Sequence, residues 1–319
     1  MTELDCMLIA NPNGKAWEFA LEIYKTLKKK SEKFHINEMH VQKFRDNEVK
    51  TKIKDNVRQK KCFFIHDSSK NPSEWFLELL LVNETLKNSS AYEVNDILPY
   101  LKFSRQDRKD ESRVPISARV VADCISQYAS RVITADVHSP QIQGFYRIPF
   151  DNLYTSPVIM SHLKNNHPEI LENLVIMSPD AGGADRAKSF AKRMGTEYFV
   201  IGYKYRKTAG EVTEFKLLGD VNEKNVLIID DMIDSGNSLV EASKKAKEHG
   251  SKKVYAYATH GLFSENAKEK LTKEFDRIFV SNSIPQQNYE NIESVSLVDL
   301  FSEAIYRTNE GLSLSELFR

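Results

Sequence analysis

The segment 226–239 (VLIIDDMIDSGNSL) has the residue types and spacing of a sugar-phosphate site. Its apolar first half is expected to form a strand that ends in acidic residues, followed by a small-residue turn that opens a helix. In an open α/β sheet, ligands bind beyond the carboxyl ends of the strands. Small turn residues let backbone N–H groups approach a phosphate, and the helix N-terminus adds a favourable dipole. The aspartates cannot serve the phosphate and should face sugar hydroxyls or Mg²⁺.

The residues that this interpretation assigns to the site are Asp230, Asp231, Asp234, Ser235, Gly236, Asn237 and Ser238. The alternative is an acidic strand end followed by a serine N-cap, which any α/β protein could contain. Three carboxylates and an S-G-x-S turn at this spacing exceed what helix capping requires. The pattern therefore favours a phosphosugar ligand.

Two other expected strand ends carry polar side chains. Asp136 and His138 are two residues apart, so in a strand they would point to the same face. A carboxylate beside an imidazole suits a metal ion or a histidine fixed in one tautomer; a solvent-facing histidine is the alternative. Asp180 precedes Gly182, Gly183 and an expected helix, where either a polar ligand or a simple glycine turn would fit.

Two charged stretches could bind a polyphosphate. Residues 104–113 (SRQDRKDESR) lie before an expected helix that has Pro115 and Ser117 near its start. Arginines can bind phosphates bidentately, and such loops often close over a site to exclude water. Residues 204–207 (KYRK) follow the strand-like segment EYFVIGY. A solvated charged face is the alternative for both stretches.

Short apolar runs alternate with amphipathic stretches along the chain, which predicts an α/β fold with mostly parallel sheets flanked by helices. In the first half, strands are expected at 62–67 and 95–104, and helices at 73–89 and 117–129. In the second half, the expected strands are 173–180, 197–203, 225–231 and 253–263, and the expected helices are 184–194, 237–250 and 264–275.

The break between the two halves is expected at 151–157 (DNLYTSP), which gives domains 1–155 and 156–319. Residues after about 296 look helical and could pack back on either domain, the N-terminal one included. No linker rich in Gly, Ser or Pro separates the halves, so a fixed interface is expected rather than loose tethering.

The bulk composition excludes several classes of protein. Among 319 residues, 45 Lys and Arg balance 45 Asp and Glu, so no excess charge recruits nucleic acid or an anionic membrane. Three scattered cysteines argue against a disulfide framework and a thiolate zinc site. The N-terminus lacks a signal-peptide pattern, and no apolar run approaches the roughly 18 residues that span a bilayer. A cytoplasmic enzyme without a P-loop, H-E-x-x-H or G-x-S-x-G motif is expected.

Taken in order, these segments resemble the ribose-phosphate diphosphokinase (PRPP synthetase) family over nearly the whole chain. FRDNE at 44–48 is similar to the family's F-S-D-G-E element, and PYLKFSRQDRKDESRVPISAR is similar to its flexible catalytic loop. ADVHSPQIQGFYRIPFDNLY resembles D-L-H-x-x-Q-I-Q-G-F-F, and MSPDAGG resembles S-P-D-x-G-G. DDMIDSGNSL occupies the place of the ribose 5-phosphate loop.

The resemblance implies two tandem domains of the type I phosphoribosyltransferase fold. It implies an enzyme of nucleotide biosynthesis that transfers the β,γ-diphosphoryl group of ATP to the C1 hydroxyl of ribose 5-phosphate, with Mg²⁺, giving PRPP and AMP. It also implies a homo-oligomer, of the hexamer-of-dimers type, in which a neighbouring chain supplies part of the ATP site.

The resemblance further assigns roles to single residues. The catalytic residues would be Lys204, Arg206 and His138. The ATP site would contain Phe44, Asp46, Glu48, Arg105, Gln106 and Asp110, with the first three supplied by a neighbouring chain. Asp180 would join the ribose 5-phosphate loop, and His138, Asp180 and Asp136 would hold the metal.

The C-terminal AIYRTNEGLSLSELF resembles family members that phosphate activates and ADP inhibits at a second site. The matching positions for that site are Arg58, Gln143, Asp151, Asn152, Ser313 and Ser315, although Asn56 stands where a serine is usual. Allosteric control is therefore a hypothesis.

Other departures from the family pattern are Asn47 for Gly, Tyr205 for Glu, and S-G-N-S where T-[CG]-G-T is usual. Asn tolerates positive φ best after Gly, so Asn47 and Asn237 are expected to keep the backbone conformation. Two alternatives stay open. A phosphoribosyltransferase would not need the Phe44 element and the 104–113 loop, and a non-catalytic regulatory subunit should have lost the cationic and metal residues that remain here.

Overall fold

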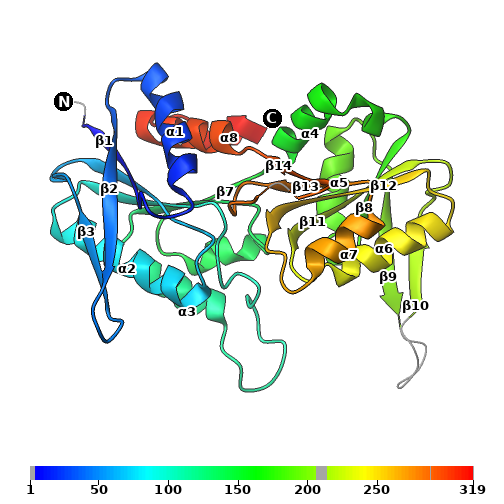
Figure 1. The fold of residues 1–319 in the computed structure, drawn as a ribbon, viewed down its shortest axis with the longest axis horizontal. Helices are drawn as coiled ribbons and strands as arrows, with labels where there is room; N and C mark the ends of the chain where they lie inside the picture. Colours follow the sequence, from blue (N-terminus) through cyan, green and yellow to red (C-terminus); the bar gives the residue numbers. More distant parts are fainter. Residues whose placement is uncertain (1–3, 206–213, 288, 319) are drawn as a thin grey trace. The chain divides into compact units, whose positions relative to one another are not determined.

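The computed structural model describes residues 4–205, 214–287 and 289–318 (Figure 1). The chain divides into two compact units. Unit 1 comprises Met1–Tyr154, Ser283–Pro285 and Leu297–Arg319, and unit 2 comprises Thr155–Asn282 and Gln286–Ser296. Within the described ranges, no helix is long and apolar enough to cross a membrane.

Unit 1 is built on a seven-stranded sheet with the order β3-β2-β1-β4-β5-β6-β7. Its strands are β1 (Cys6–Ala10), β2 (Phe34–Lys43), β3 (Val49–Ile53), β4 (Lys61–Ile65), β5 (Glu93–Leu98), β6 (Arg131–Ala135) and β7 (Phe150–Leu153). Its helices are α1 (Trp17–Lys30), α2 (Pro72–Asn88), α3 (Ser117–Ile125), η1 (Pro140–Phe145), α8 (Val298–Glu310) and η3 (Leu314–Phe318). All neighbouring strands are parallel except the β2–β3 pair.

Unit 2 repeats this architecture with the strand order β10-β9-β8-β11-β12-β13-β14. Its strands are β8 (Leu174–Ser178), β9 (Phe199–Tyr205), β10 (Glu214–Leu218), β11 (Asn225–Ile233), β12 (Lys253–Gly261), β13 (Arg277–Ser281) and β14 (Ile292–Val295). Its helices are α4 (Ser156–Asn166), η2 (Pro168–Leu171), α5 (Ala184–Arg193), α6 (Asn237–Glu248) and α7 (Ala267–Glu274). Only β9 and β10 pair antiparallel among these strands.

The predicted α/β class with two mostly parallel sheets is confirmed. Central strands such as β4 and β8 are apolar along their length because helices cover both faces of a parallel sheet. The sequence pattern did not predict the antiparallel hairpins β2–β3 and β9–β10. The strand expected at 95–104 was too long: β5 ends at Leu98 because Pro99 cannot donate to the ladder.

The C-terminal helix α8 packs against α1 within unit 1. The rings of Phe19 and Phe301 meet edge to face with their centroids 5.7 Å apart. Lys30 of α1 forms an ion pair with Glu303 of α8 at the same interface. Unit 1 is therefore built from both ends of the chain, and the roles assigned to domains 1–155 and 156–319 stay predictions.

A buried carboxyl group in β5 makes the stability of unit 1 depend on pH. Asp96 is fully buried, and its Oδ2 accepts a 2.8 Å hydrogen bond from Asn83 Nδ2. Burial raises the pKa of Asp96 to about 8, although the hydrogen bond opposes the shift. Because the folded-state pKa lies above the unfolded value, this group takes up a proton on folding. The contribution of this proton uptake to the free energy of unfolding is fully present below about pH 4 and is lost as the pH rises through about 8.

We expect Asp96→Asn to increase the free energy of unfolding, with a gain roughly 3–4 kcal/mol larger at pH 8 than at pH 5. The amide resembles the neutral carboxyl group in shape and needs no proton. Chemical denaturation at both pH values measures the gain, with the more exposed Asp123→Asn on α3 as control. An equal gain at pH 5 and pH 8 would mean that Asp96 does not titrate in this range.

Candidate active site

The turn after β11 places a left-handed glycine directly before a helix. β11 ends at Ile233 and α6 begins at Asn237, with Gly236 between them at φ +75°. A Cβ at Gly236 would lie 2.9 Å from Leu271 Cδ1, so a side chain has no room there. The backbone N–H groups of Leu262 and Ser264 donate to the carbonyls of Ile233 and Asp234 at 2.9 and 3.2 Å. The chain after β12 therefore fixes the path of the turn.

Of the two asparagines expected to keep the backbone conformation of a glycine, only Asn47 has a positive φ. Asn47 has φ +71° and keeps the left-handed conformation that a glycine would adopt. Asn237 is the first residue of α6 and is not left-handed, because Gly236 already makes the turn. Its side-chain oxygen instead accepts a 2.9 Å hydrogen bond from Lys270 Nζ.

The two aspartates at the end of β11 share one cation. Arg186 Nη1 lies 3.2 Å from Asp230 Oδ1 and 3.0 Å from Asp231 Oδ1. Asp231 is buried, and its N–H donates to Asp230 Oδ1 at 2.8 Å. Burial and the adjacent charge of Asp231 raise the pKa of Asp230. A ligand that donates hydrogen bonds or brings positive charge would favour the ionised form of this pair.

Arg186 was not among the residues expected from the sequence. It lies in the first turn of α5, six residues after Asp180, in the segment SPDAGGADRAK. The signal was an arginine at the start of a helix that follows a glycine turn. Its two acceptors are 44 and 45 residues away, so only the folded sheet brings the three groups together.

The Asp180 turn follows β8, the strand next to β11, so both turns lie at the same edge of the sheet. Asp180 is exposed, and its Oδ1 accepts a 3.0 Å hydrogen bond from the N–H of Gly183. A Cβ at Gly183 would lie 2.5 Å from Ser178 Oγ. The glycine is therefore required for close packing and is not only a flexible joint.

Lys204 lies near the end of β9, which continues past the carboxyl end of β8. Ile201 pairs with Ser178, and the strand runs on to Tyr205. A Cβ at Gly202 would lie 2.7 Å from the carbonyl oxygen of Pro179, so glycine permits this approach. The backbone thus places Lys204 at the same sheet edge as Asp180. Arg206 lies outside the described residues.

In unit 1, the argument that Asp136 and His138 share a strand face is wrong. β6 ends at Ala135, and Asp136 has φ +34°, so the alternation of a strand does not reach either residue. The Asp136 N–H donates to the carbonyl of Leu153 at 2.9 Å, and the N–H of Val137 donates to Asn152 Oδ1 at 3.0 Å. These bonds hold a turn from which the exposed His138 follows at the carboxyl end of β6.

The charged loop 104–113 is joined to the start of α3 through Gln106. The carbonyl of Gln106 accepts a 3.2 Å hydrogen bond from Ala118, and its Oε1 accepts from Ser117 Oγ. Arg105 and Asp110 are exposed. Gln106 is thus held by the fold, whereas most of the charged residues around it are exposed.

The Phe44 element forms the tip of the β2–β3 hairpin (Figure 1). Phe44 is 55% exposed, its N–H donates to the carbonyl of Glu48 at 2.8 Å, and Asp46 Oδ1 accepts from the N–H of Glu48 at 3.1 Å. β2 lies four strand spacings from β6, which is about 19 Å across the sheet. Unit 1 therefore does not bring Phe44 and His138 together.

The six positions assigned to a regulatory site all belong to unit 1 but lie on different elements. Asp151 and Asn152 are on β7, where Asp151 forms an ion pair with Arg131. Ser313 and Ser315 are joined by a 2.9 Å hydrogen bond between their hydroxyls. Gln143 lies in η1 after the carboxyl end of β6, whereas Arg58 precedes β4 at the opposite edge of the sheet.

Two helix-flanked, mostly parallel sheets with polar turns at the carboxyl ends of their strands define a protein of the phosphoribosyltransferase-like fold. Phosphoribosylpyrophosphate synthetase from Mycobacterium smegmatis has this fold with a TM-score of 0.86 and 28% identity, over 96% of this chain and 99% of that one. Residues 10–128 match the N-terminal domain of ribose phosphate pyrophosphokinase, and residues 206–319 match the phosphoribosyl synthetase-associated domain.

Curated relatives agree with these matches. The ribose-phosphate pyrophosphokinase of Chlorobaculum tepidum is 42% identical over 279 residues, 86% of this chain and 85% of the relative. That of Aquifex aeolicus is 39% identical over 279 residues, 86% of this chain and 89% of the relative. The chain belongs to the ribose-phosphate pyrophosphokinase family, whose members are diphosphotransferases.

Proposed function

We propose that this enzyme transfers the β,γ-diphosphoryl group of ATP to the C1 hydroxyl of ribose 5-phosphate and releases AMP. The observation that carries the proposal is the β11–α6 turn. It combines a left-handed Gly236, a helix N-terminus and the Asp230–Asp231 pair at one sheet edge, in a chain of this family.

Ribose 5-phosphate fits the two kinds of group in that turn. Backbone N–H groups around Gly236 and the hydroxyls of Ser235 and Ser238 are donors for the 5-phosphate. Asp230 and Asp231 accept hydrogen bonds from the ribose hydroxyls, and Arg186 holds both carboxylates in place. Asp234 and Asn237 border the phosphate end of the same turn.

The ATP-binding residues are assigned to unit 1. Phe44 offers an exposed ring on which adenine can stack, and Asp46 and Glu48 beside it can accept hydrogen bonds from the nucleoside. Arg105, Gln106 and Asp110 belong to the loop that would contact the phosphates. The distance between the hairpin and β6 within one unit supports an ATP site that uses the hairpin of a second chain.

Magnesium suits the carboxylates of the exposed Asp180 and the half-buried Asp136, because oxygen is the ligand that Mg²⁺ prefers. A ring N–H of His138 can donate a hydrogen bond to a phosphate oxygen. This role fits the imidazole at least as well as coordination of Mg²⁺ does. When bound, Mg²⁺ would neutralise phosphate charge during transfer.

The transfer breaks the bond between the β-phosphorus and the bridging oxygen to the α-phosphate while the C1 oxygen bonds to the β-phosphorus. The C1 hydroxyl loses its proton, and AMP leaves with the bridging oxygen. Negative charge grows on the bridging and non-bridging oxygens, and the cationic Lys204 and Arg206 are proposed to stabilise it. Holding the C1 hydroxyl in line with the leaving AMP supplies much of the remaining rate.

Two defective chains should complement each other if the hairpin serves a neighbour. In oligomers of Phe44→Ala chains and Lys204→Ala chains mixed equally, roughly a quarter of the sites would pair an intact hairpin with an intact Lys204. Activity in the co-expressed mixture should therefore exceed that of either variant alone. Tyr92→Ala, which removes another exposed ring of unit 1, serves as control. If the mixture is no more active than either variant alone, the hairpin serves the ATP site of its own chain.

The proposal is tested by incubating the protein with ATP, Mg²⁺ and ribose 5-phosphate and separating the nucleotides. AMP that forms only with ribose 5-phosphate supports diphosphoryl transfer, whereas ADP would indicate an ordinary kinase. Absence of turnover would favour a regulatory subunit. Formation of a nucleotide from PRPP and a free base would favour a phosphoribosyltransferase.

Three finer proposals accompany this function. The enzyme works as a homo-oligomer of the hexamer-of-dimers type in the cytoplasm, a compartment that suits its free cysteines. Sedimentation velocity that detects only monomers would overturn the proposed homo-oligomer. Cell fractionation that finds the protein outside the cytoplasm would overturn the proposed localisation. Phosphate and ADP act at the regulatory positions in unit 1. ADP inhibition that is purely competitive with ATP, without phosphate activation, would exclude such a site.

A further inference from the structure

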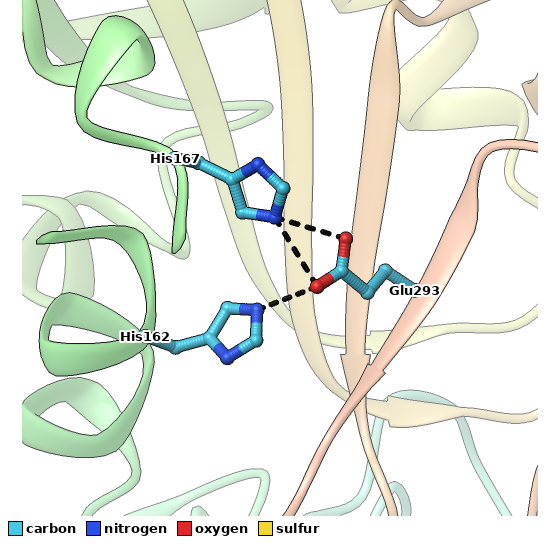
Figure 2. Close-up of side chains that lie close together, drawn as sticks. All are labelled: His162, His167 and Glu293. Carbon is cyan, nitrogen blue, oxygen red and sulfur yellow. Dashed lines mark hydrogen bonds and ion pairs between the residues drawn. The ribbon is translucent and has the colours of Figure 1, made fainter. Parts of the chain in front are cut away.

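Two histidines and a glutamate converge in unit 2, outside the candidate active site (Figure 2). His162 Nε2 lies 2.7 Å from Glu293 Oε1, and His167 Nε2 lies 3.2 Å from the same oxygen. One ligand atom from each residue can be chosen so that all lie within 4.8 Å of one another. A tetrahedral ion with ligands at about 2.1 Å separates them by about 3.4 Å, so small side-chain shifts suffice.

Each of these side chains has an outer partner. Arg277 Nη1 donates to Glu293 Oε2 at 2.7 Å, which orients the carboxylate. His167 Nε2 lies 3.0 Å from this same oxygen, and His162 Nε2 faces Oε1. His167 Nδ1 lies 3.6 Å from Glu169 Oε1, and His162 Nδ1 lies 3.1 Å from the amide of Asn166. At His167, a carboxylate beside Nδ1 favours the tautomer in which Nε2 carries a lone pair for a metal. At His162, the amide nitrogen of Asn166 donates to Nδ1, so metal binding there requires this amide to turn its oxygen toward Nδ1.

The cluster is partly sheltered and has a rigid base. The side chains of His162 and His167 are 20% and 12% exposed, and that of Glu293 is 27% exposed. The ring of the fully buried Phe279 lies 5.3 Å from that of His167 and 6.0 Å from that of His162, centroid to centroid. With neutral histidines, Glu293 and Glu169 outweigh Arg277 by one negative charge.

The cluster lies at the amino-end side of the sheet. Arg277 is the first residue of β13, and Glu293 is the second residue of the edge strand β14. The β11–α6 turn follows the carboxyl end of its strand, at the opposite edge. The two features are therefore independent, and failure of one proposal leaves the other standing.

We propose that His162, His167 and Glu293 bind one divalent transition metal ion per chain, with Zn²⁺ as the best match. Two imidazoles and a carboxylate suit zinc rather than magnesium. The ion would connect the end of α4 to the edge strand β14, which the fold otherwise joins there by hydrogen bonds and ion pairs.

The test measures Zn²⁺ binding to the full chain by calorimetry after chelator treatment and removal of the chelator, in millimolar Mg²⁺ to occupy oxygen-ligand sites. Wild type should bind one more equivalent than His162→Asn/His167→Asn, or bind it at least about 100-fold more tightly. Co²⁺ in place of Zn²⁺ should give intense visible bands of a tetrahedral site in wild type only. Circular dichroism checks that the variants fold.

Two further variants keep the test decisive. His40→Asn removes a histidine whose Nε2 lies 3.2 Å from Glu38 Oε2, on a carboxylate that also pairs with Lys54, and should bind Zn²⁺ like wild type. Glu169→Gln keeps all three ligands and should weaken binding about 10-fold. Equal stoichiometry and affinity in wild type and the double variant would overturn the proposal and identify the cluster as a plain hydrogen-bonded ion-pair network.

Discussion

Replacing Lys204 with alanine is expected to lower kcat for AMP formation about 10²–10³-fold, because one fixed cation at the reacting phosphate is lost. β9 carries the residue past the carboxyl end of β8, to the sheet edge where the Asp180 turn lies. KM for ribose 5-phosphate should change little, since the β11–α6 turn is untouched. Steady-state kinetics with both substrates varied separates the two effects.

Lys216→Ala is the matched control for Lys204. Lys216 is an exposed lysine on β10, the strand that pairs with β9, and it faces Tyr203 in the register. Its removal should leave kcat within about twofold of wild type, as for an ordinary surface residue. A Lys204→Ala enzyme with unchanged kcat would remove this lysine from the mechanism.

Gly236→Ala is expected to raise KM for ribose 5-phosphate at least about 10-fold, since distortion of the turn misdirects its N–H donors. The left-handed φ of +75° costs an L-residue roughly 1 kcal/mol. The added Cβ would also press on Leu271, so the turn or α7 must shift.

Gly195→Ala separates backbone strain from the effect on the turn. Gly195 also has a positive φ, +80°, but an added Cβ there meets no atom within 4 Å. It should lose similar stability and keep wild-type kinetics. Equal KM values for ribose 5-phosphate in the two variants would mean that the β11–α6 turn does not bind the sugar phosphate.

The α/β fold and the strand, turn and helix around Gly236 could be predicted because their signals are local. The apolar run before Asp230, and the small residues after it, give the strand, the turn and the helix without knowledge of the rest of the chain. The hairpin at Phe44 escaped prediction because its strands β2 and β3 contain few buried residues, so the apolar pattern is weak. Strand alternation failed at Asp136 because a single left-handed residue ends it.

Groups that meet only through the fold could not be paired with one another from the sequence alone. Arg186, in the first turn of α5, contacts Asp230 on β11, and nothing in its own segment indicates a carboxylate partner. Glu293 is 131 residues from His162, and neither belongs to a motif of metal ligands. Such sites depend on strand order and register, which a single sequence does not specify.

The position of bond cleavage in ATP is the most direct test of the proposed transfer. Ribose 5-phosphate labelled with ¹⁸O at the C1 hydroxyl is incubated with ATP and Mg²⁺, and the products are examined by ³¹P NMR. Attack at the β-phosphorus predicts ¹⁸O between C1 and the diphosphoryl group of PRPP, with unlabelled AMP. An adenylylated ribose 5-phosphate with the label between C1 and the α-phosphorus, formed together with pyrophosphate, would mean attack at the α-phosphorus. ADP with labelled ribose 1,5-bisphosphate would mean attack at the γ-phosphorus; either result would contradict diphosphoryl transfer.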